Sequence, residues 1–366
     1  MSCLQAWPEP IVRVQSLSES GMREIPERYV KRPSERPDRC SEEDGKEVNI
    51  PVIDLSEVFS DGDPAARERA MAAVDEACRE WGFFQVVKHG VNEELMLRTR
   101  EAWREFFRLP VEEKQAYANL PATYEGYGSR LGVEMGGKLD WSDYFFLHYL
   151  PHSIRDPNKW PKLPTTCREL VGEYGDEVAK LCGKLNKILS VNLGLEEDHL
   201  EKAFGGEDKI GACMRVNFYP KCPQPDLTLG LSPHSDPGGI TLLLPDDDVA
   251  GLQVRRGSNW LTVKPIPNAF IVNIGDQIQV ISNAIYKSVE HRVMVNSAKE
   301  RVSLAFFYNP TGDIPIRPAK QLVKEDEADL YHQAMTFNDY RLFIREKGLH
   351  GKLQLQSLIN SPPPQK

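Results

Sequence analysis

The sequence predicts a mainly β protein with flanking helices and a double-sheet jelly roll at its core. From Gly211 onward the chain consists of short apolar segments separated by Pro and Gly residues, and many short strands with such turns are typical of a jelly roll. The chain before Gly211 instead carries long helical patterns. Four of the strands expected in the roll cover residues 240–244, 252–254, 260–266 and 269–274.

The first half of the chain is predicted to combine two short strands with three amphipathic helices. The strands cover residues 50–55 and 82–88. The helices cover residues 64–80, 93–107 and 170–193, and we expect the last and longest to form the spine behind the sheet. The apolar faces of the three helices hold, in this order, Ala70, Val74 and Ala77; Leu97, Trp103 and Phe107; and Val178, Leu181, Leu185, Ile188 and Leu189.

We expect four consecutive regions along the chain. Residues 1–48 are rich in charge and proline and are predicted to form an arm that lies over the body, with a mobile loop at 38–46. Residues 49–205 are expected to form an N-terminal region with helices, residues 206–315 the jelly-roll core, and residues 316–366 a C-terminal helical region. The chain has no internal repeats, and its last six residues are expected to be disordered.

Composition and charge narrow the class of protein. A chain of 366 residues that is 40% hydrophobic can bury a large core. Its formal net charge of −9 argues against a surface for nucleic acid or acidic membranes. The seven cysteines are irregularly spaced, and Cys78, Cys182 and Cys213 are interpreted as buried thiols. Because no segment reaches the ~18 apolar residues of a membrane helix, we expect a soluble, cytoplasmic protein, with the nucleus as a second compartment.

The most informative motif is His234-Ser235-Asp236, followed 57 residues later by His291. In an extended segment residues i and i+2 share a face, so His234 and Asp236 can hold one ion while Ser235 points away. His291 lies in a β-branched run, 286–295, that predicts another strand. Two imidazoles and one carboxylate leave three octahedral positions open, which suits non-haem Fe(II). A lone His-x-Asp is more often a turn or a surface pair, but here separate elements occur in order inside a strand-rich region.

A second motif begins the predicted strand 301–308. The period of two places Arg301 and Ser303 on one face, together with Ala305 and Phe307. A guanidinium fork beside a hydroxyl is suited to hold a buried carboxylate. Since the metal needs a partner with a carboxylate at its far end, 2-oxoglutarate is the candidate cosubstrate.

The predicted strand 213–219 has one polar and one apolar face. The polar positions are Arg215, Asn217 and Tyr219, and the apolar positions are Met214, Val216 and Phe218. The simplest interpretation is an ordinary strand whose polar side faces water. If the polar face instead lines a pocket, Arg215 is a buried cation that needs an anion to meet it.

Two further arginines, Arg341 and Arg345, lie four residues apart on a predicted helix that Thr336 and Asp339 cap. Like charges at this spacing repel by about a few tenths of a kcal/mol, so a compensating group is expected. From the sequence alone, two solvated arginines are the more common arrangement.

Taken together, these motifs resemble the plant Fe(II)- and 2-oxoglutarate-dependent dioxygenases. The His-x-Asp pair, the distal histidine, the Arg-x-Ser pair and the upstream Asn-Phe-Tyr-Pro at 217–220 occur in that family's order. The likeness extends from about Trp7 to Leu349, and it includes segments at 51–55 and 81–86 that are typical of the family's first half. Within the family the chain is most similar to the jasmonate-induced oxygenases, through residues 7–17, 124–132 and 340–345.

The resemblance implies a cupin-like double-stranded β-helix and roles for individual side chains. The implied iron ligands are His234, Asp236 and His291. The implied 2-oxoglutarate contacts are Arg301, Ser303, Asn217 and Tyr219. Many relatives have a second tyrosine where this chain has Phe218, which points to the opposite face.

In jasmonate-oxidising members, arginines hold the carboxylate of the substrate, and Arg215, Arg341 and Arg345 match them. Phe146 and Phe307 match positions of aromatic walls in the pocket. For Phe146 a plain core aromatic remains an alternative. Other histidines, such as His89, His148 and His152, lack the companion residues of a metal site.

The implied activity is hydroxylation of jasmonic acid at its pentenyl tail (C12), which lowers the hormone level. It would use Fe(II), with 2-oxoglutarate and O2 as cosubstrates and ascorbate as activator, and would release succinate and CO2. Two alternatives stay open. A flavonoid-type dioxygenase, similar to flavonol or anthocyanidin synthases, would share the iron chemistry, but its neutral polyphenol substrates give no reason for three pocket arginines. A non-catalytic hormone-binding homologue would have no chemical need for the intact metal and Arg-x-Ser motifs.

Overall fold

The structure is a computed structural model, and it describes residues 7, 12–37, 49–59, 62–130, 136–323, 331, 335–349 and 351–360. The predicted mobile loop at 38–46 and the predicted disordered tail at 361–366 lie outside these residues. In the part of the chain that is described, no helix is long and apolar enough to cross a membrane.

Two sheets form the roll. The larger sheet contains, from edge to edge, β1 (Val52–Asp54), β2 (Phe83–Val87), β10 (Phe270–Ile274), β7 (Ile240–Leu244), β12 (Arg301–Asn309), β5 (Gly211–Tyr219), β4 (Asp143–Leu150) and β3 (Gly126–Gly128). The smaller sheet contains β6 (Leu231–His234), β11 (His291–Val293), β8 (Leu252–Arg256) and β9 (Asn259–Thr262). From β5 to β12 the chain passes back and forth between the two sheets. The predicted jelly roll with flanking helices is confirmed.

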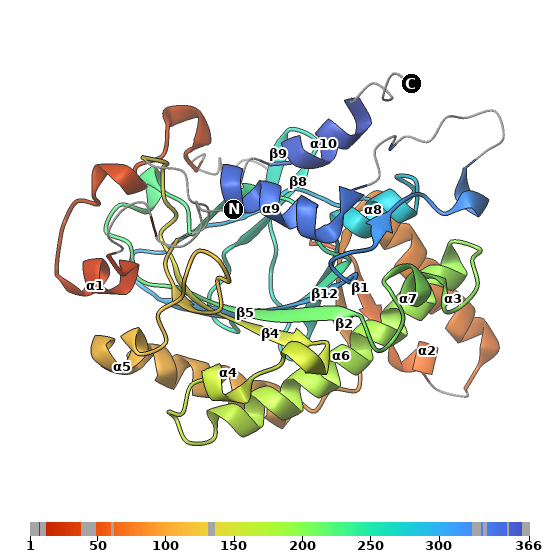
Figure 1. The fold of residues 1–366 in the computed structure, drawn as a ribbon, viewed down its shortest axis with the longest axis horizontal. Helices are drawn as coiled ribbons and strands as arrows, with labels where there is room; N and C mark the ends of the chain where they lie inside the picture. The colour runs from red at the N-terminus through yellow and green to blue at the C-terminus, as the bar shows by residue number, and fades with distance from the viewer. Residues whose placement is uncertain are drawn as a thin grey trace.

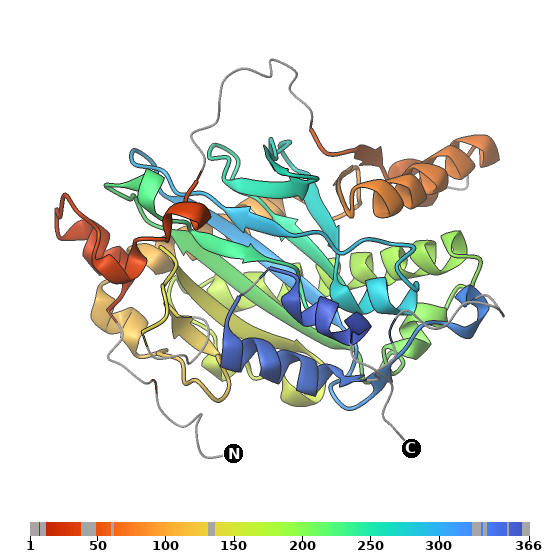
Figure 2. The same ribbon diagram turned by 90° about the horizontal axis from the view of Figure 1, so that it is seen from above.

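Helices cover the outer face of the larger sheet. Figure 1 shows α4 (Glu93–Arg108) and α6 (Cys167–Asn192) on one side of β4 and β5, with β8 and β9 on the other. The remaining α-helices are α1 (Val14–Glu19), α2 (Ser56–Phe59), α3 (Pro64–Glu80), α5 (Val111–Gln115), α7 (His199–Ala203), α8 (Asp276–Ile281), α9 (Phe337–Lys347) and α10 (Leu353–Asn360). In both views α9 and α10 lie beside each other at one side of the two sheets (Figures 1 and 2). A short ribbon pairs β13 (Pro315–Ile316) with β14 (Met335–Thr336).

The helix expectations hold, with one correction. The predicted helix 64–80 is α3, which begins where the Asp63 carboxylate accepts a hydrogen bond from the Ala65 amide at 3.0 Å. The expected apolar face of α6 is buried as predicted, and so are Trp103 and Phe107 on α4. Leu97 was expected with them but is 44% exposed. The buried stripe of α4 runs through Met96 and Thr99, and each residue turns the helix by about 100°, so Leu97 falls on the flank.

Two predicted strands are shorter than expected. β9 ends at Thr262, ahead of Pro265 and Pro267, because proline has no N–H for a ladder. In the run 286–295 only His291–Val293 is a strand. The preceding amides of Lys287 and Ser288 bond instead to the Cys78 carbonyl and the Gln279 side chain, at 3.1 and 2.7 Å.

The described part of the N-terminal arm packs against one end of the roll. The amides of Val14 and Gln15 donate to the buried carboxylate of Asp143 at 3.0 and 2.8 Å. Val14 and Tyr29 pack with Trp141 in a small apolar cluster. The three cysteines expected to be buried thiols are buried and take part in no disulfide among the described residues.

Candidate active site

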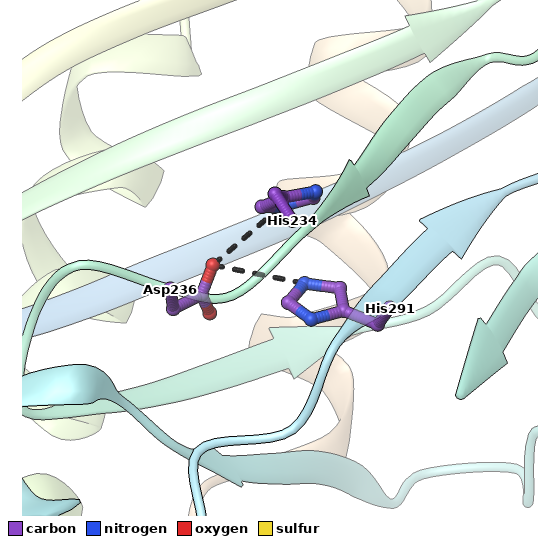
Figure 3. Close-up of side chains that lie close together, drawn as sticks. All are labelled: His234, Asp236 and His291. Atoms are coloured by element: carbon purple, nitrogen blue, oxygen red, sulfur yellow. Dashed lines mark ion pairs between the residues drawn. The ribbon is translucent and has the colours of Figure 1, made fainter. Parts of the chain in front are cut away.

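Three side chains converge at the end of the smaller sheet. His234 ends β6, and His291 begins β11 directly opposite it in the strand register. The Nε2 atoms of the two imidazoles lie 3.7 and 3.6 Å from Oδ1 of Asp236 (Figure 3). All three residues are buried, and their ligand atoms lie within 4.8 Å of one another. Ser235 points away and donates to Asp276 at 3.1 Å, as the i, i+2 pattern predicts.

Each histidine is oriented by a backbone carbonyl. Nδ1 of His234 lies 2.8 Å from the Ser232 carbonyl, and Nδ1 of His291 lies 3.2 Å from the Val289 carbonyl. A carbonyl can only accept, so Nδ1 carries the proton and Nε2 keeps its lone pair for a metal. Burial, together with the neighbouring imidazole of His291, lowers the pKa of His234 to about 4, so its ring is neutral at pH 7.

The two oxygens of the Asp236 carboxylate make different contacts. Its Oδ2 accepts hydrogen bonds from the Thr241 hydroxyl at 2.6 Å and the Asn273 amide at 2.7 Å. Its Oδ1 faces the two imidazoles. Burial alone would raise the pKa of Asp236, but the imidazoles and these two donors outweigh burial and hold the pKa below its usual value. A charged oxygen beside two imidazole lone pairs is a ligand set that fits Fe(II).

The polar residues of β5 and β12 share the inner face of the larger sheet. In the antiparallel register Arg301 lies opposite Tyr219, and Ser303 lies opposite Asn217. Residues directly opposite in such a pair point to the same face. The alternative of a strand with its polar side in water is wrong, because Asn217 and Tyr219 are buried. Phe218 points to the other face and stacks on Phe107, as expected.

Arg301 is a buried guanidinium held from one side. Its Nε donates to the Val249 carbonyl at 3.2 Å and its Nη1 to the Ser303 hydroxyl at 3.3 Å. Its Cζ lies 5.2 Å from the centre of the Tyr219 ring. No carboxylate pairs with it among the residues that the structure describes. A buried cation of this kind fits the distal carboxylate of a dicarboxylic cosubstrate.

Arg215 lies farther along the same face. It is half-buried, its Cζ lies 4.2 Å from the centre of the Tyr144 ring, and its buried Nε has no partner among the described residues. Phe146 lies opposite Arg215 in the register of β4 and β5 and is half-buried. Phe307 is half-buried on the same inner face. The strand pattern therefore gathers one cationic and two aromatic side chains on the inner face of the larger sheet.

A cavity of about 590 Å³ opens next to this face. Its walls include Lys31 of the N-terminal arm, Asp140, Tyr144, Arg215, Ser232 and Gly351 of the C-terminal segment. The three metal-site residues are not part of its wall. It nevertheless adjoins them, since the Ser232 carbonyl orients His234 and Arg215 shares a sheet face with Arg301.

The other two arginines predicted to bind the substrate, Arg341 and Arg345, belong to α9. α9 begins as predicted, with the Thr336 hydroxyl accepting from the Asp339 amide at 3.2 Å. Arg341 is partly buried, its Cζ lies 5.3 Å from the Phe337 ring centre, and its buried Nε has no partner among the described residues. It is not among the residues that line the cavity. The side chain of Arg345 lies outside the described part of the structure.

Several residues that support the site were not predicted. Thr241 and Asn273 fix Asp236, Tyr144 stacks on Arg215, and Lys31 closes part of the cavity. Asn273 carried a visible signal, because it interrupts the apolar strand 269–274. Lys31 carried none, since its position depends on how the arm folds back.

Comparison with known proteins agrees with this geometry. The profile of the 2OG-Fe(II) oxygenase superfamily matches residues 210–310, and that of the non-haem dioxygenase in morphine synthesis N-terminal region matches residues 50–163. Jasmonate-induced oxygenase 2 of Arabidopsis thaliana is 61% identical over 357 residues, which cover 98% of this chain and 95% of that protein. Leucoanthocyanidin dioxygenase of Malus domestica is 39% identical and covers 87% of this chain and 91% of that protein.

A solved structure also shows similarity to a jasmonate-induced oxygenase. The crystal structure of JOX2 in complex with 2-oxoglutarate, iron and jasmonic acid matches with a TM-score of 0.90 and 60% identity, over 98% of this chain and 100% of that chain. The expected enzyme class is confirmed, with Fe(II) as cofactor and 2-oxoglutarate and O2 as cosubstrates. The chain belongs to the 2-oxoglutarate- and Fe(II)-dependent oxygenase superfamily and, within it, to the jasmonate-induced oxygenases.

Proposed function

We propose that this enzyme hydroxylates jasmonic acid at C12 of its pentenyl tail and thereby lowers the level of the active hormone. The observation that carries the proposal is the Arg215 guanidinium, which lines the cavity and whose buried Nε has no partner among the residues that the structure describes. A carboxylate substrate supplies the anion that this cation needs. The relative at 61% identity, and the solved structure that contains jasmonic acid, support the same substrate.

We assign the iron to His234, Asp236 and His291, each of which offers one free ligand atom. Bound iron supplies the oxidative chemistry in which 2-oxoglutarate becomes succinate and CO2 and the substrate gains a hydroxyl group. The chain contributes orientation: the Ser232 and Val289 carbonyls hold the imidazoles, while Thr241 and Asn273 hold the carboxylate. These contacts keep three ligand atoms preorganised in a buried site.

The remaining side chains would bind the two small molecules. Arg301 and Ser303, with Asn217 and Tyr219, would hold 2-oxoglutarate, because they form a buried polar patch with a guanidinium free of carboxylate partners among the described residues. Arg215, Arg341 and Arg345 would hold the substrate carboxylate, and Phe146 and Phe307 would flank its apolar body. Fixing the carboxylate end leaves the far alkyl end to face the metal.

We also propose that the enzyme works in the cytoplasm, with the nucleus as a second compartment. The five described cysteines are buried and form no disulfide with one another, which supports a reducing compartment.

Replacing Arg301 by lysine is expected to raise the KM for 2-oxoglutarate by about tenfold or more, because an ammonium group cannot offer a planar two-donor fork to a carboxylate. The measurement is succinate release as a function of 2-oxoglutarate concentration. Arg98→Lys, on the exposed surface of α4, is the matched control and should keep the parental KM. An unchanged KM in Arg301→Lys would remove Arg301 from the cosubstrate site.

The proposed substrate is tested by weighing the products formed from competing compounds. The enzyme is incubated with Fe(II), 2-oxoglutarate and ascorbate, and with jasmonic acid, its uncharged methyl ester or a flavonoid. We expect hydroxylation of the acid, weak turnover of the ester and no product from the flavonoid. Turnover of the flavonoid without turnover of jasmonic acid would contradict the proposal and favour the flavonoid-type alternative, whose relative is 39% identical. Jasmonate binding without any succinate would favour a non-catalytic hormone-binding protein.

A further inference from the structure

Asp276 connects the candidate metal site to helix α9, although it touches neither the ligand atoms that face one another nor the cavity. It opens α8 and is buried. Its Oδ2 accepts hydrogen bonds from the hydroxyl of Ser235 at 3.1 Å and from that of Tyr340 at 2.7 Å. Its Oδ1 accepts from the hydroxyl of Ser288 at 2.7 Å. We call Asp276, Ser235, Ser288 and Tyr340 the Asp276 network.

The network reaches both segments that carry metal ligands. Ser235 lies between His234 and Asp236, and the Asp276 amide also donates to the Asp236 carbonyl at 2.8 Å. Ser288 lies three residues before His291. The hydrogen bonds from Ser235 and Ser288 to Asp276 do not involve the atoms that would bind the metal. They can therefore fix the positions of the two ligand-bearing segments without occupying a coordination position.

The third hydrogen bond of the network, from Tyr340, attaches α9 to Asp276. Tyr340 is 1% exposed, whereas Leu342 and Phe343 on the same helix are 40% and 38% exposed. The Thr336–Asp339 bond caps the helix from within, while the Tyr340 hydroxyl reaches into the body of the protein. Arg341 directly follows Tyr340, so a rotation of α9 about its axis would move both residues together.

The C-terminal segment that follows α9 makes parallel contacts. The Gly351 amide donates to the Pro233 carbonyl at 3.0 Å, next to His234. The Lys352 ammonium donates to the Ser288 carbonyl and, at 3.2 Å, to the Gln279 side chain. The segment after α9 therefore bonds to the same two stretches of chain that the Asp276 carboxylate holds.

A buried carboxylate is an expensive way to join packed segments. An apolar side chain of similar size would fill the space without the desolvation of a charge, and such replacements are often neutral or stabilising. A polar network of this kind instead selects one relative position of the parts it joins, because any shift leaves a buried polar atom without a partner.

We propose that Asp276 is a positioning residue of the reaction, which through Tyr340 keeps α9 and its Arg341 in a fixed position relative to the metal-ligand segments. The role of Arg341 rests on the proposed function, whereas the link between α9 and the ligand segments does not. In this arrangement the substrate carboxylate bound by Arg341 stays at a constant distance from the metal. Each oxidation of 2-oxoglutarate is therefore coupled to one hydroxylation of the substrate. Loosening the link separates the two events.

The test removes one oxygen atom, in Tyr340→Phe, and keeps the buried ring. Tyr286→Phe is the matched control, because the Tyr286 hydroxyl donates to the Asp75 carboxylate at the same 2.7 Å and is equally buried, but joins neither α9 nor the loop 235–239. Hydrogen–deuterium exchange on the metal-free enzyme should be severalfold faster in Tyr340→Phe, both in α9 and in the loop 235–239. Tyr286→Phe should keep the parental exchange in both segments.

A second readout is the amount of hydroxylated jasmonate formed per succinate. This ratio should fall severalfold in Tyr340→Phe and stay parental in Tyr286→Phe. If Tyr340 acts through Asp276, Tyr340→Phe should cause little further loss in an Asp276→Asn background, since coupled residues are not additive. If the Asp276→Asn variant does not fold, the hydrogen–deuterium exchange of the Tyr340→Phe variant is sufficient by itself to test the proposal.

The outcomes separate this inference from the proposed function. Faster exchange confined to α9, with the loop unchanged, would show that Tyr340 merely anchors its helix and would overturn the positioning role. Faster exchange in both segments, in an enzyme that leaves jasmonate untouched, would sustain the link and refute the substrate.

Discussion

Replacing His234 by alanine is expected to abolish succinate formation, to below about 1% of the parental rate, and to leave the fold intact. Removing a hydrogen-bonding partner of a metal ligand already costs roughly 10–100-fold in such sites, and here a proposed ligand itself is lost. The fold should survive because the side chain's hydrogen bond to the Ser232 carbonyl is local.

The measurement is succinate release in the presence of Fe(II), with circular dichroism and thermal unfolding to verify folding. His152→Ala is the control, since His152 is exposed on the short helix His152–Ile154 and is not one of the three clustered residues. A folded His234→Ala enzyme with parental turnover would refute the iron assignment.

Changing Arg341 and Arg345 together to alanine is expected to cripple jasmonate hydroxylation while decarboxylation of 2-oxoglutarate persists. Each charge-assisted bond to a carboxylate contributes about 1.5–3 kcal/mol, so the loss in kcat/KM should exceed tenfold. Arg215→Ala should act in the same direction, because Arg215 lines the cavity. Lysine should rescue poorly at these positions, since it lacks the planar fork.

The two readouts are hydroxylated product and succinate, followed side by side. Arg98→Ala, an exposed helical arginine on α4, controls for the loss of a positive charge. If the arginines of α9 are merely solvated, the double variant should change neither readout. Jasmonate turnover at the parental rate would disprove the anion clamp at Arg341 and Arg345.

The sequence predicted the periodic parts of the fold well. Strands and helices that bury a regular stripe, such as α3, α6 and β7, appear where the pattern places them. The errors have local causes. Leu97 is apolar but lies beside the buried stripe of α4. In the run 286–295 the Ser288 amide donates to the Gln279 side chain and not to a neighbouring strand, so the strand begins only at His291.

The site was predictable to the extent that strand alternation determines it. Because i and i+2 share a face, the alternation grouped Asn217 with Tyr219 on β5 and Ser303 with Arg301 on β12, whereas the pairing of the two strands came from the structure. The contacts that orient the ligands could not be predicted in this way. Thr241 and Asn273 reach Asp236 from different strands, and Tyr340 meets Asp276 from 64 residues away, so both depend on how distant segments pack.

The position of the new hydroxyl group on jasmonate tests the account most directly. The product formed from jasmonic acid, Fe(II), 2-oxoglutarate and O2 is isolated, and its hydroxyl is located by nuclear magnetic resonance. If arginines fix the carboxylate and the opposite end of the molecule faces His234, Asp236 and His291, the hydroxyl lies on C12 of the pentenyl tail. A hydroxyl on the cyclopentanone ring or next to the carboxylate would contradict that orientation, and the absence of any hydroxylated jasmonate would contradict the proposed function itself.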